Sequence, residues 1–79
     1  MFMDKNEFIK KFAEQFDETD VSLIKADTEF RKFDEWSSLI GLCIVSMIKD
    51  EYGFFISPSE FKKCVTVNDV YNLVISYKA

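Results

Sequence analysis

The feature that most limits the fold of this chain is the apolar run within residues 33–52, which read FDEWSSLIGLCIVSMIKDEY. Its apolar side chains lie close to helical spacing, but they occupy more than one face of the helix. Such a helix is expected to be largely surrounded by protein. We predict that it runs from about Ser38 to Asp50 or Glu51, and that Gly53 ends it.

The first turn of this predicted helix contains a serine, Ser38, whose hydroxyl group is a candidate attachment site. Ser37 is the predicted N-cap, which places Ser38 at the first helical position. Unpaired backbone N–H groups point toward this end of a helix, and the helix dipole favours negative charge there. The position of Ser38 is therefore suited to carrying an anionic group.

The size and composition of the chain predict one domain, residues 1–79. Apolar residues make up 48% of the chain and include nine Phe, so a core is feasible without a metal or a disulfide. Cys43 and Cys64 stand among apolar residues, and we interpret them as reduced, buried thiols of a cytoplasmic protein. We expect no signal peptide and no membrane span.

Several classes of function are not expected from this composition. The sequence contains no histidine, which argues against a zinc site and histidine-based catalysis, and we expect no metal site. A small enzyme is rejected because no pair of catalytic acids stands in a plausible pocket. The net charge of −4 argues against nucleic acid as a partner. The acidic excess lies in residues 1–20 and 34–53, where it serves solubility or steers docking onto basic partners.

The first helix and the connection after it are predicted from apolar spacing. Asp4 is the expected N-cap, and the helix is expected to end near Phe16. Residues 17–36 then form a connection that is long for so small a domain, and it spans two helices or positions a site. Its apolar residues imply that it packs onto the helices; they are Val21, Leu23 and Ile24, then Phe30 and Phe33.

Two capping patterns predict the remaining helices. Ser57 caps a short helix that begins at Pro58 and ends around residue 63 or 64. Thr66 caps the last helix, and Asp69 stands three residues later, as in a capping box. No strand is predicted. The expected fold class is all-α, a four-helix bundle with three longer helices, a short third helix and a long connection between helices 1 and 2.

Four short motifs follow one another along these predicted helices. They are Ser37-Ser38-Leu39 at the start of the central helix, Ile48-x-x-Glu51-Tyr52-Gly53 at its end, Ile56-Ser57-Pro58 before the short helix and Thr66-Val67-Asn68-Asp69 before the last one. Their order resembles that of the acyl carrier protein family, over about residues 3 to 77. The resemblance implies a four-helix bundle of the acyl-carrier type.

The resemblance also implies a carrier and not an enzyme. Ser38 would be esterified by 4′-phosphopantetheine from coenzyme A, in a reaction that a separate phosphopantetheinyl transferase performs with Mg²⁺. The terminal thiol of this arm would hold an acyl group as a thioester, in fatty acid, polyketide or related lipid biosynthesis. The implied partners are the transferase and acyl-transferring and condensing enzymes, and the carrier is expected to be a monomer.

Residues around Ser38 belong to the same predicted site. Ser37 and Leu39 flank the serine, and Trp36 either shapes the entrance for the arm or fixes the long connection onto the helices. The apolar interior would shelter the acyl chain. The candidates for lining that space, which are equally explained as core residues, are Leu39, Leu42, Val45, Ile56, Phe61 and Val70.

The start of the central helix departs from the family pattern. Ser37 replaces the aspartate that usually precedes the serine, which preserves the cap but removes a charge beside the attachment site. Ile40, Cys43 and Lys49 stand at positions where the family commonly has acids. These departures favour a dedicated carrier in a polyketide, modified-lipid or aminoacyl pathway over a housekeeping fatty-acid carrier.

The same departures change the predicted docking surface. We expect docking to rely on apolar contacts through Ile40, Ile44 and Met47 more than on charge, unless these residues only repack the helix locally. The acids that remain for docking are Asp34, Glu35, Asp50 and Glu51.

Two related functions stay open at this point. An aminoacyl or peptidyl carrier would share the fold, the arm and the serine. An unmodified helical interaction module with the carrier fold belongs to another class, and the serine at position 38 speaks against it.

Overall fold

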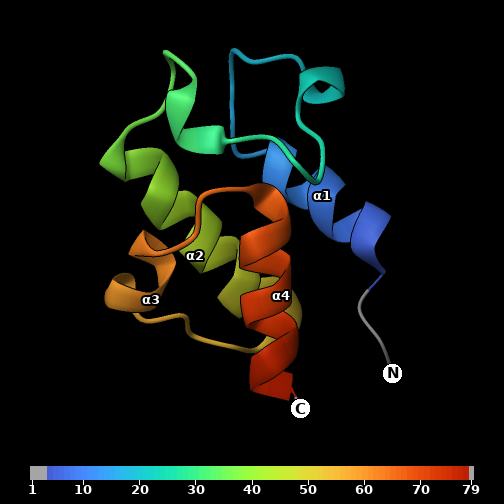
Figure 1. The fold of residues 1–79 in the computed structure, drawn as a ribbon, viewed down its shortest axis with the longest axis vertical. Coiled ribbons are helices and arrows are strands. Elements are labelled where there is room, and N and C mark those ends of the chain that lie inside the picture. The colour runs from blue at the N-terminus through green and yellow to red at the C-terminus, as the bar shows by residue number, and fades with distance from the viewer. Residues whose placement is uncertain (1–3, 79) are drawn as a thin grey trace.

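The computed structural model describes residues 4–78, and in this part the chain forms four α-helices (Figure 1). They are α1 (Lys5–Ala13), α2 (Ser38–Tyr52), α3 (Pro58–Lys62) and α4 (Val67–Lys78). Across the same residues, extended pairing is confined to one bridge between Glu29 and Thr66. The predicted all-α class, with three longer helices and a short third one, is confirmed.

Side chains just before the helices cap their first turns. Asp4, Ser37 and Ser57 cap α1, α2 and α3. At α4 the capping box is reciprocal: Thr66 Oγ1 accepts a hydrogen bond from the Asp69 N–H at 3.2 Å, and Asp69 Oδ2 accepts one from the Thr66 N–H at 3.0 Å. Backbone N–H groups of Thr66 and Val65 hold the pKa of Asp69 below its ordinary value. The predicted helix starts are confirmed.

The ends of the two long N-terminal helices differ slightly from the prediction. α1 ends at Ala13 and not near Phe16, because the chain tightens into a turn in which the Phe16 N–H donates to the Ala13 carbonyl at 3.0 Å. Phe16 is nevertheless buried, as its apolar spacing implied. α2 continues to Tyr52, and Gly53 follows it in the left-handed conformation with φ of 81°.

The connection between α1 and α2 packs onto the helices. It contains two short 3₁₀ helices, η1 (Val21–Leu23) and η2 (Phe30–Lys32). Phe30 is fully buried, and Ile24 is also buried, whereas Val21 and Leu23 are exposed. The prediction of a packed connection is therefore confirmed, but the expected apolar patch at residues 21–24 buries only Ile24.

Backbone hydrogen bonds fasten this connection to the start of α4. The Val67 N–H donates to the Thr28 carbonyl at 3.1 Å, and the Asn68 N–H donates to the Ala26 carbonyl at 2.8 Å. These two N–H groups belong to the first turn of α4, where they have no partner inside the helix. Carbonyl groups of the long connection thus pair with N–H groups at the start of α4 that the helix itself leaves unpaired.

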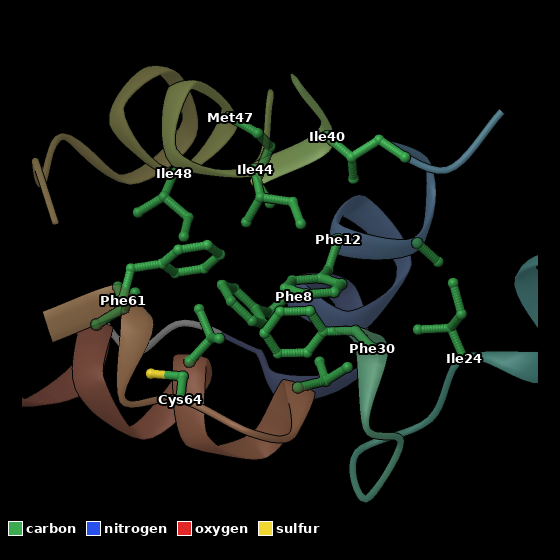
Figure 2. Packing of buried hydrophobic residues seen from close by; sticks show 14 of the residues in the cluster. Phe8, Phe12, Ile24, Phe30, Ile40, Ile44, Met47, Ile48, Phe61 and Cys64 are labelled. Atoms are coloured by element: carbon green, nitrogen blue, oxygen red, sulfur yellow. The ribbon is translucent and has the colours of Figure 1, made fainter. Parts of the chain in front are cut away.

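The core is built from one face of each long helix and from the connection (Figure 2). α1 packs against both α2 and α4. Aromatic rings from α1 and the connection meet at its centre, where the Phe12 and Phe30 rings are edge to face with centroids 5.1 Å apart. The fully buried large side chains are Phe8, Phe12, Phe30, Ile44, Ile48, Ile56, Val67, Val70 and Val74.

The inward face of α2 contains the residues that we expected to dock partners. Ile40, Ile44 and Met47 are all buried, and Figure 2 shows Ile44 and Ile48 projecting from α2 into the core. Exposure of Ile40 and Met47 was therefore a wrong expectation. The physical reason is that positions 40, 44, 47 and 48 form one stripe at helical spacing, and the aromatic core covers that stripe.

The outward face of α2 also carries apolar side chains in its first two turns. Leu39 and Leu42 are exposed, and so is the thiol-bearing Cys43. Cys64 is buried beside α4. Both cysteines are free thiols. The prediction of a buried thiol is thus confirmed for Cys64 and wrong for Cys43.

Candidate functional site

A cleft of about 710 Å³ lies between α2 and α3. Most of the side chains around it are apolar, and they include Trp36, Leu42, Val45, Phe55, Ile56 and Phe61. Ser38 lines the same cleft. The cleft therefore places a hydroxyl group beside a space that suits an apolar ligand.

Ser38 is the first residue of α2, and it is exposed. The preceding Ser37 caps the helix, because its Oγ accepts a hydrogen bond from the Ile40 N–H at 3.4 Å. The Gly41 N–H donates to the Ser37 carbonyl at 3.1 Å and closes the first turn. An anionic group on the Ser38 oxygen would lie at the positive end of the α2 dipole, while the hydroxyl remains open to another protein.

Trp36 fixes the end of the connection against the helices. Its ring lies edge to face with Phe30 at a centroid distance of 5.3 Å, and it also approaches Phe16 and Phe61. A Cβ atom on Gly41 would lie only 3.3 Å from Trp36 Cη2, so the glycine allows the indole to lie close to α2. Trp36 thus anchors the connection, and the same side chain forms a wall of the cleft.

Arg31 lines the cleft and links the connection to α3. Its Nη2 donates to the Phe61 carbonyl at 2.8 Å, and its Nη1 donates to the Cys64 carbonyl. The guanidinium carbon lies 4.8 Å from the Phe30 ring centroid and 5.1 Å from that of Phe61. Arg31 therefore satisfies two carbonyl groups at the end of α3 and holds three parts of the chain together.

The charged side chains in the lining of the cleft are Arg31 and Lys62, and both are basic. A cationic ligand group would meet charges of its own sign there, whereas an anionic group would meet opposite charges. The cleft therefore has a positive character in a chain whose net charge is −4.

Glu35, one of the predicted docking acids, has a role inside the protein. Its carboxylate accepts hydrogen bonds from the Glu18 N–H at 3.0 Å and from Thr19 Oγ1 at 2.7 Å. Removal from water acts to raise the pKa of Glu35, but the hydrogen bonds from Thr19 and Glu18 outweigh it and hold the pKa below its ordinary value. Glu35 fastens the connection near the start of α2.

The other predicted docking acids lie at two separate places. Asp34 is exposed before α2, whereas Asp50 and Glu51 are exposed near its end. Glu51 pairs with Lys11 of α1 at 2.6 Å, and this hydrogen bond raises the pKa of Lys11. Within residues 4–78, Asp34 and Asp50 are thus the two acids of this group whose side chains form no hydrogen bond or ion pair.

The predicted lining residues fall into three groups. Leu42, Val45, Ile56 and Phe61 line the cleft. Leu39 is exposed and does not line the cleft, and Val70 is fully buried in the core. Sequence reasoning missed Arg31, Phe55 and Lys62. The signals that could have found them are the chain's single arginine beside Phe30 and the apolar pair Phe54-Phe55 before the short helix.

Two further properties of the described residues bear on function. Within residues 4–78, no helix is both long and apolar enough to cross a membrane. In this part of the chain, no group of three or more His, Cys, Asp or Glu side chains is placed to hold a metal ion.

Comparisons with protein-family models, curated proteins and solved structures find no match to this chain.

Proposed function

We propose that this chain is an acyl carrier protein, in which Ser38 carries a 4′-phosphopantetheine arm. One observation carries the proposal: Ser38 is an exposed hydroxyl at the start of α2, and it also lines an apolar cleft. Such an arrangement allows one residue to be modified by an enzyme and to present cargo to a sheltered space. The order of the helices and the long connection before α2, which resemble the carrier family, support the same proposal.

The attachment requires little of the chain itself. Ser38 Oγ attacks the phosphorus that bears the pantetheine group of coenzyme A, and the bond from that phosphorus to the nucleotide part breaks. The serine proton passes to a base on the transferase, and adenosine 3′,5′-bisphosphate leaves. The chain supplies the accessible nucleophile and a helix end that stabilises the resulting phosphodiester.

The residues around Ser38 suit this group. The phosphodiester is anionic, and it would lie at the N-terminus of α2 on a cleft whose charged residues are Arg31 and Lys62. When bound, the arm supplies a terminal thiol that holds an acyl group as a thioester. Trp36, Val45 and Phe61 offer that acyl group an apolar surface.

The cleft favours an acyl cargo over an aminoacyl cargo. The α-ammonium group of an aminoacyl thioester would face Arg31 and Lys62, which carry the same charge, and it would lose water against apolar walls. A fatty or polyketide acyl chain has neither cost. We therefore place the carrier in fatty acid, polyketide or related lipid biosynthesis.

The first experiment is modification of the purified chain with coenzyme A, Mg²⁺ and a broad-specificity phosphopantetheinyl transferase. The readout is the intact mass, followed by peptide mapping of the modified residue. We expect the mass to increase by one phosphopantetheine at Ser38. Ser38→Ala should prevent the increase, whereas Ser46→Ala should allow it, since Ser46 is another exposed serine on α2.

The opposite result would favour another function. If neither this transferase nor those of the source organism modify the wild-type chain, the carrier proposal is wrong. The unmodified interaction module with a helical fold would then be the better explanation. Modification at a serine other than Ser38 would also contradict the proposed site.

A further inference from the structure

Arg31 is a partly buried cation that no carboxylate of the described chain neutralises. Within residues 4–78, the ion pairs use Lys11 and Lys32, and none uses Arg31 or Lys62. Arg31 donates instead to two carbonyl oxygens at the end of α3. These acceptors are neutral, and the guanidinium keeps further N–H groups that can donate. The positive charge of Arg31 therefore has no anion beside it within the chain.

The guanidinium of Arg31 is held against aromatic rings in the wall of the cleft. Its carbon lies 4.8 Å from the ring centroid of Phe30, 5.1 Å from that of Phe61 and 5.5 Å from that of Trp36. The rings limit the water around the cation, which strengthens its attraction to an anion. Because the carbonyl bonds also fix its position, an anionic ligand group would meet a preorganised partner.

Lys62 adds a second positive charge to the same cleft. It is the last residue of α3, and its side chain is exposed. No Asp or Glu is among the residues that line the cleft. Glu60, two residues before Lys62, accepts a hydrogen bond from the Tyr77 hydroxyl at 2.6 Å. The acid nearest to Lys62 in sequence is therefore engaged with α4.

Other acids lie in a neighbouring hollow. Asp50 and Glu51 line this hollow, which shares Leu42 with the cleft. Its lining includes neither Arg31 nor any lysine. Glu51 is also paired with Lys11 at 2.6 Å. The acids at the end of α2 thus leave the charges of the cleft without a partner.

We propose that the cleft binds an acyl cargo whose far end carries a carboxylate, which Arg31 and Lys62 hold while the carbon chain lies against Trp36 and Phe61. The inference rests on the proposed function and specifies its cargo as the monothioester of a dicarboxylic acid. A guanidinium group matches the geometry of a carboxylate, and an ammonium group adds charge. The apolar lining covers the carbon atoms between the thioester and the carboxylate.

The phosphodiester of the arm is a less suitable partner for Arg31. It would be attached to Ser38, which is exposed, and N–H groups at the start of α2 would stabilise it there. The guanidinium packs against the rings of Trp36 and Phe61, so a group that reaches it must enter the cleft. A cargo at the end of a flexible arm can do so.

The test compares cargoes that differ only at their far end. A broad-specificity transferase loads Ser38 from adipyl-coenzyme A or from hexanoyl-coenzyme A, and intact mass verifies each product. Suberyl and octanoyl forms repeat the comparison with a longer chain. In at least one pair, the dicarboxylic form should unfold at a temperature about 4 °C or more above its monocarboxylic counterpart. A purely apolar cleft would give the opposite order, because a carboxylate without a partner resists burial.

Two further measurements show whether the carboxylate lies in the cleft. The monomethyl ester of the adipyl form retains the chain but not the charge, so it should unfold with the hexanoyl form. Trp36 is the single tryptophan of the chain, and it lines the cleft. Acrylamide, a neutral quencher, should quench its fluorescence about twofold less in the dicarboxylic form than in the form with an unloaded arm.

Substitutions at the two cations assign the effect to them. Arg31→Gln should abolish the difference between the paired cargoes, and Lys62→Gln should reduce it by about half. Lys63→Gln is the matched control, because Lys63 is an exposed neighbour that does not line the cleft. Each variant is compared with itself under two cargoes, so a general loss of stability cancels. Lys62 is exposed and unpaired, so Lys62→Gln tests the inference even if Arg31→Gln does not fold.

The remaining outcomes contradict the inference in distinguishable ways. If both monocarboxylic forms are the more stable ones, the cleft holds unsubstituted chains. If the difference survives Arg31→Gln and Lys62→Gln, the carboxylate lies elsewhere. If these substitutions destabilise the form with an unloaded arm as much as the dicarboxylic form, the cations serve the phosphodiester. In these three cases the carrier function stands, whereas a failure to load any arm onto Ser38 would overturn that function itself.

Discussion

The two faces of α2 carry similar side chains in opposite surroundings. Ile44 is fully buried on the inner face, whereas Leu42 is 65% exposed on the outer one. Both side chains are aliphatic, and the difference lies in what covers them. The aromatic rings of α1 and the connection cover the inner face, and no part of the described chain covers Leu42 in the same way. The apolar sequence of a helix therefore predicts that other groups pack against it, but it does not predict which of its faces they cover.

The inner face of α2 therefore contributes to the stability of the fold, whereas the outer face is available for binding another molecule. The inner face contributes to folding because its side chains leave water when the chain folds. The outer face remains in water in the isolated protein, so its apolar surface has little to contribute until another molecule binds. Four predictions test this separation.

The largest effect is expected from shortening a side chain on the inner face. Ile44→Ala should lower the free energy of unfolding by about 3 kcal/mol, because it leaves a cavity among packed rings. A domain of this size has about 4–12 kcal/mol in total, so the variant should be close to unfolding. Leu42→Ala should change stability by about 0.5 kcal/mol or less, since the side chain is already exposed.

Urea denaturation followed by circular dichroism measures both values, and the two substitutions remove the same number of carbon atoms. The comparison fails if Leu42→Ala lowers the free energy of unfolding as much as Ile44→Ala does. That result would mean that the outer face is also packed in the free protein.

The two thiols report the same separation by their reactivity. Cys43 lies on the outer face of α2, whereas Cys64 is 5% exposed, and burial raises the pKa of its thiol. Because the thiolate is the reactive form, Cys43 should react with iodoacetamide about a hundredfold faster than Cys64. Mass spectrometry of mapped peptides over time measures both rates.

Cys43→Ala and Cys64→Ala assign the two rates, and denaturant supplies the control. In urea above the unfolding transition both thiols should react at similar rates. Rapid labelling of Cys64 in the native protein would show that the core beside α4 opens readily.

A smaller effect is expected at the start of α2. Ser37→Ala removes the acceptor for the Ile40 N–H, and it should lower the free energy of unfolding by about 1 kcal/mol. Ser37→Asp should preserve stability, because aspartate also caps and favours the helix dipole. Thermal unfolding measures the two values, and amide exchange at Ile40 should be faster in the alanine variant alone. Equal stability in all three proteins would show that the cap does not fix this end of the helix.

The sequence predicted the local features of the fold well. Helix starts depend on contacts within one turn, so Asp4, Ser37, Ser57 and Thr66 could be identified from neighbouring residues alone. The short third helix followed from the same reasoning, because Pro58 fixes its first turn.

Features that depend on distant contacts were predicted less well. The sequence of α2 offers apolar residues on several faces, and the choice of inner face depends on where α1 and the connection pack. Exposure of Ile40 was expected from a family pattern of surface acids, but here the aromatic core covers it. Arg31 stands out in the sequence as the single arginine, but its carbonyl partners are 30 and 33 residues away, so its contacts could not be predicted from its neighbours.

The smallest effect is expected at Glu35, which tests whether the acids beside α2 serve the fold. Its pKa is lowered, so its stabilising contribution is present above the ordinary pKa of a glutamate and is lost as the pH falls through the lowered value. Glu35→Gln should therefore be less stable than the wild type at pH 7, and the two should converge at an acid pH below the lowered pKa of Glu35. Asp34→Asn, at an exposed neighbour, controls for the loss of one negative charge. Urea denaturation at both pH values measures the difference. If Glu35→Gln lowers kcat/KM for Ser38 modification without changing stability, the acid serves docking after all. The contrast between the apolar start of the outer face of α2 and the internal role of Glu35 is then wrong.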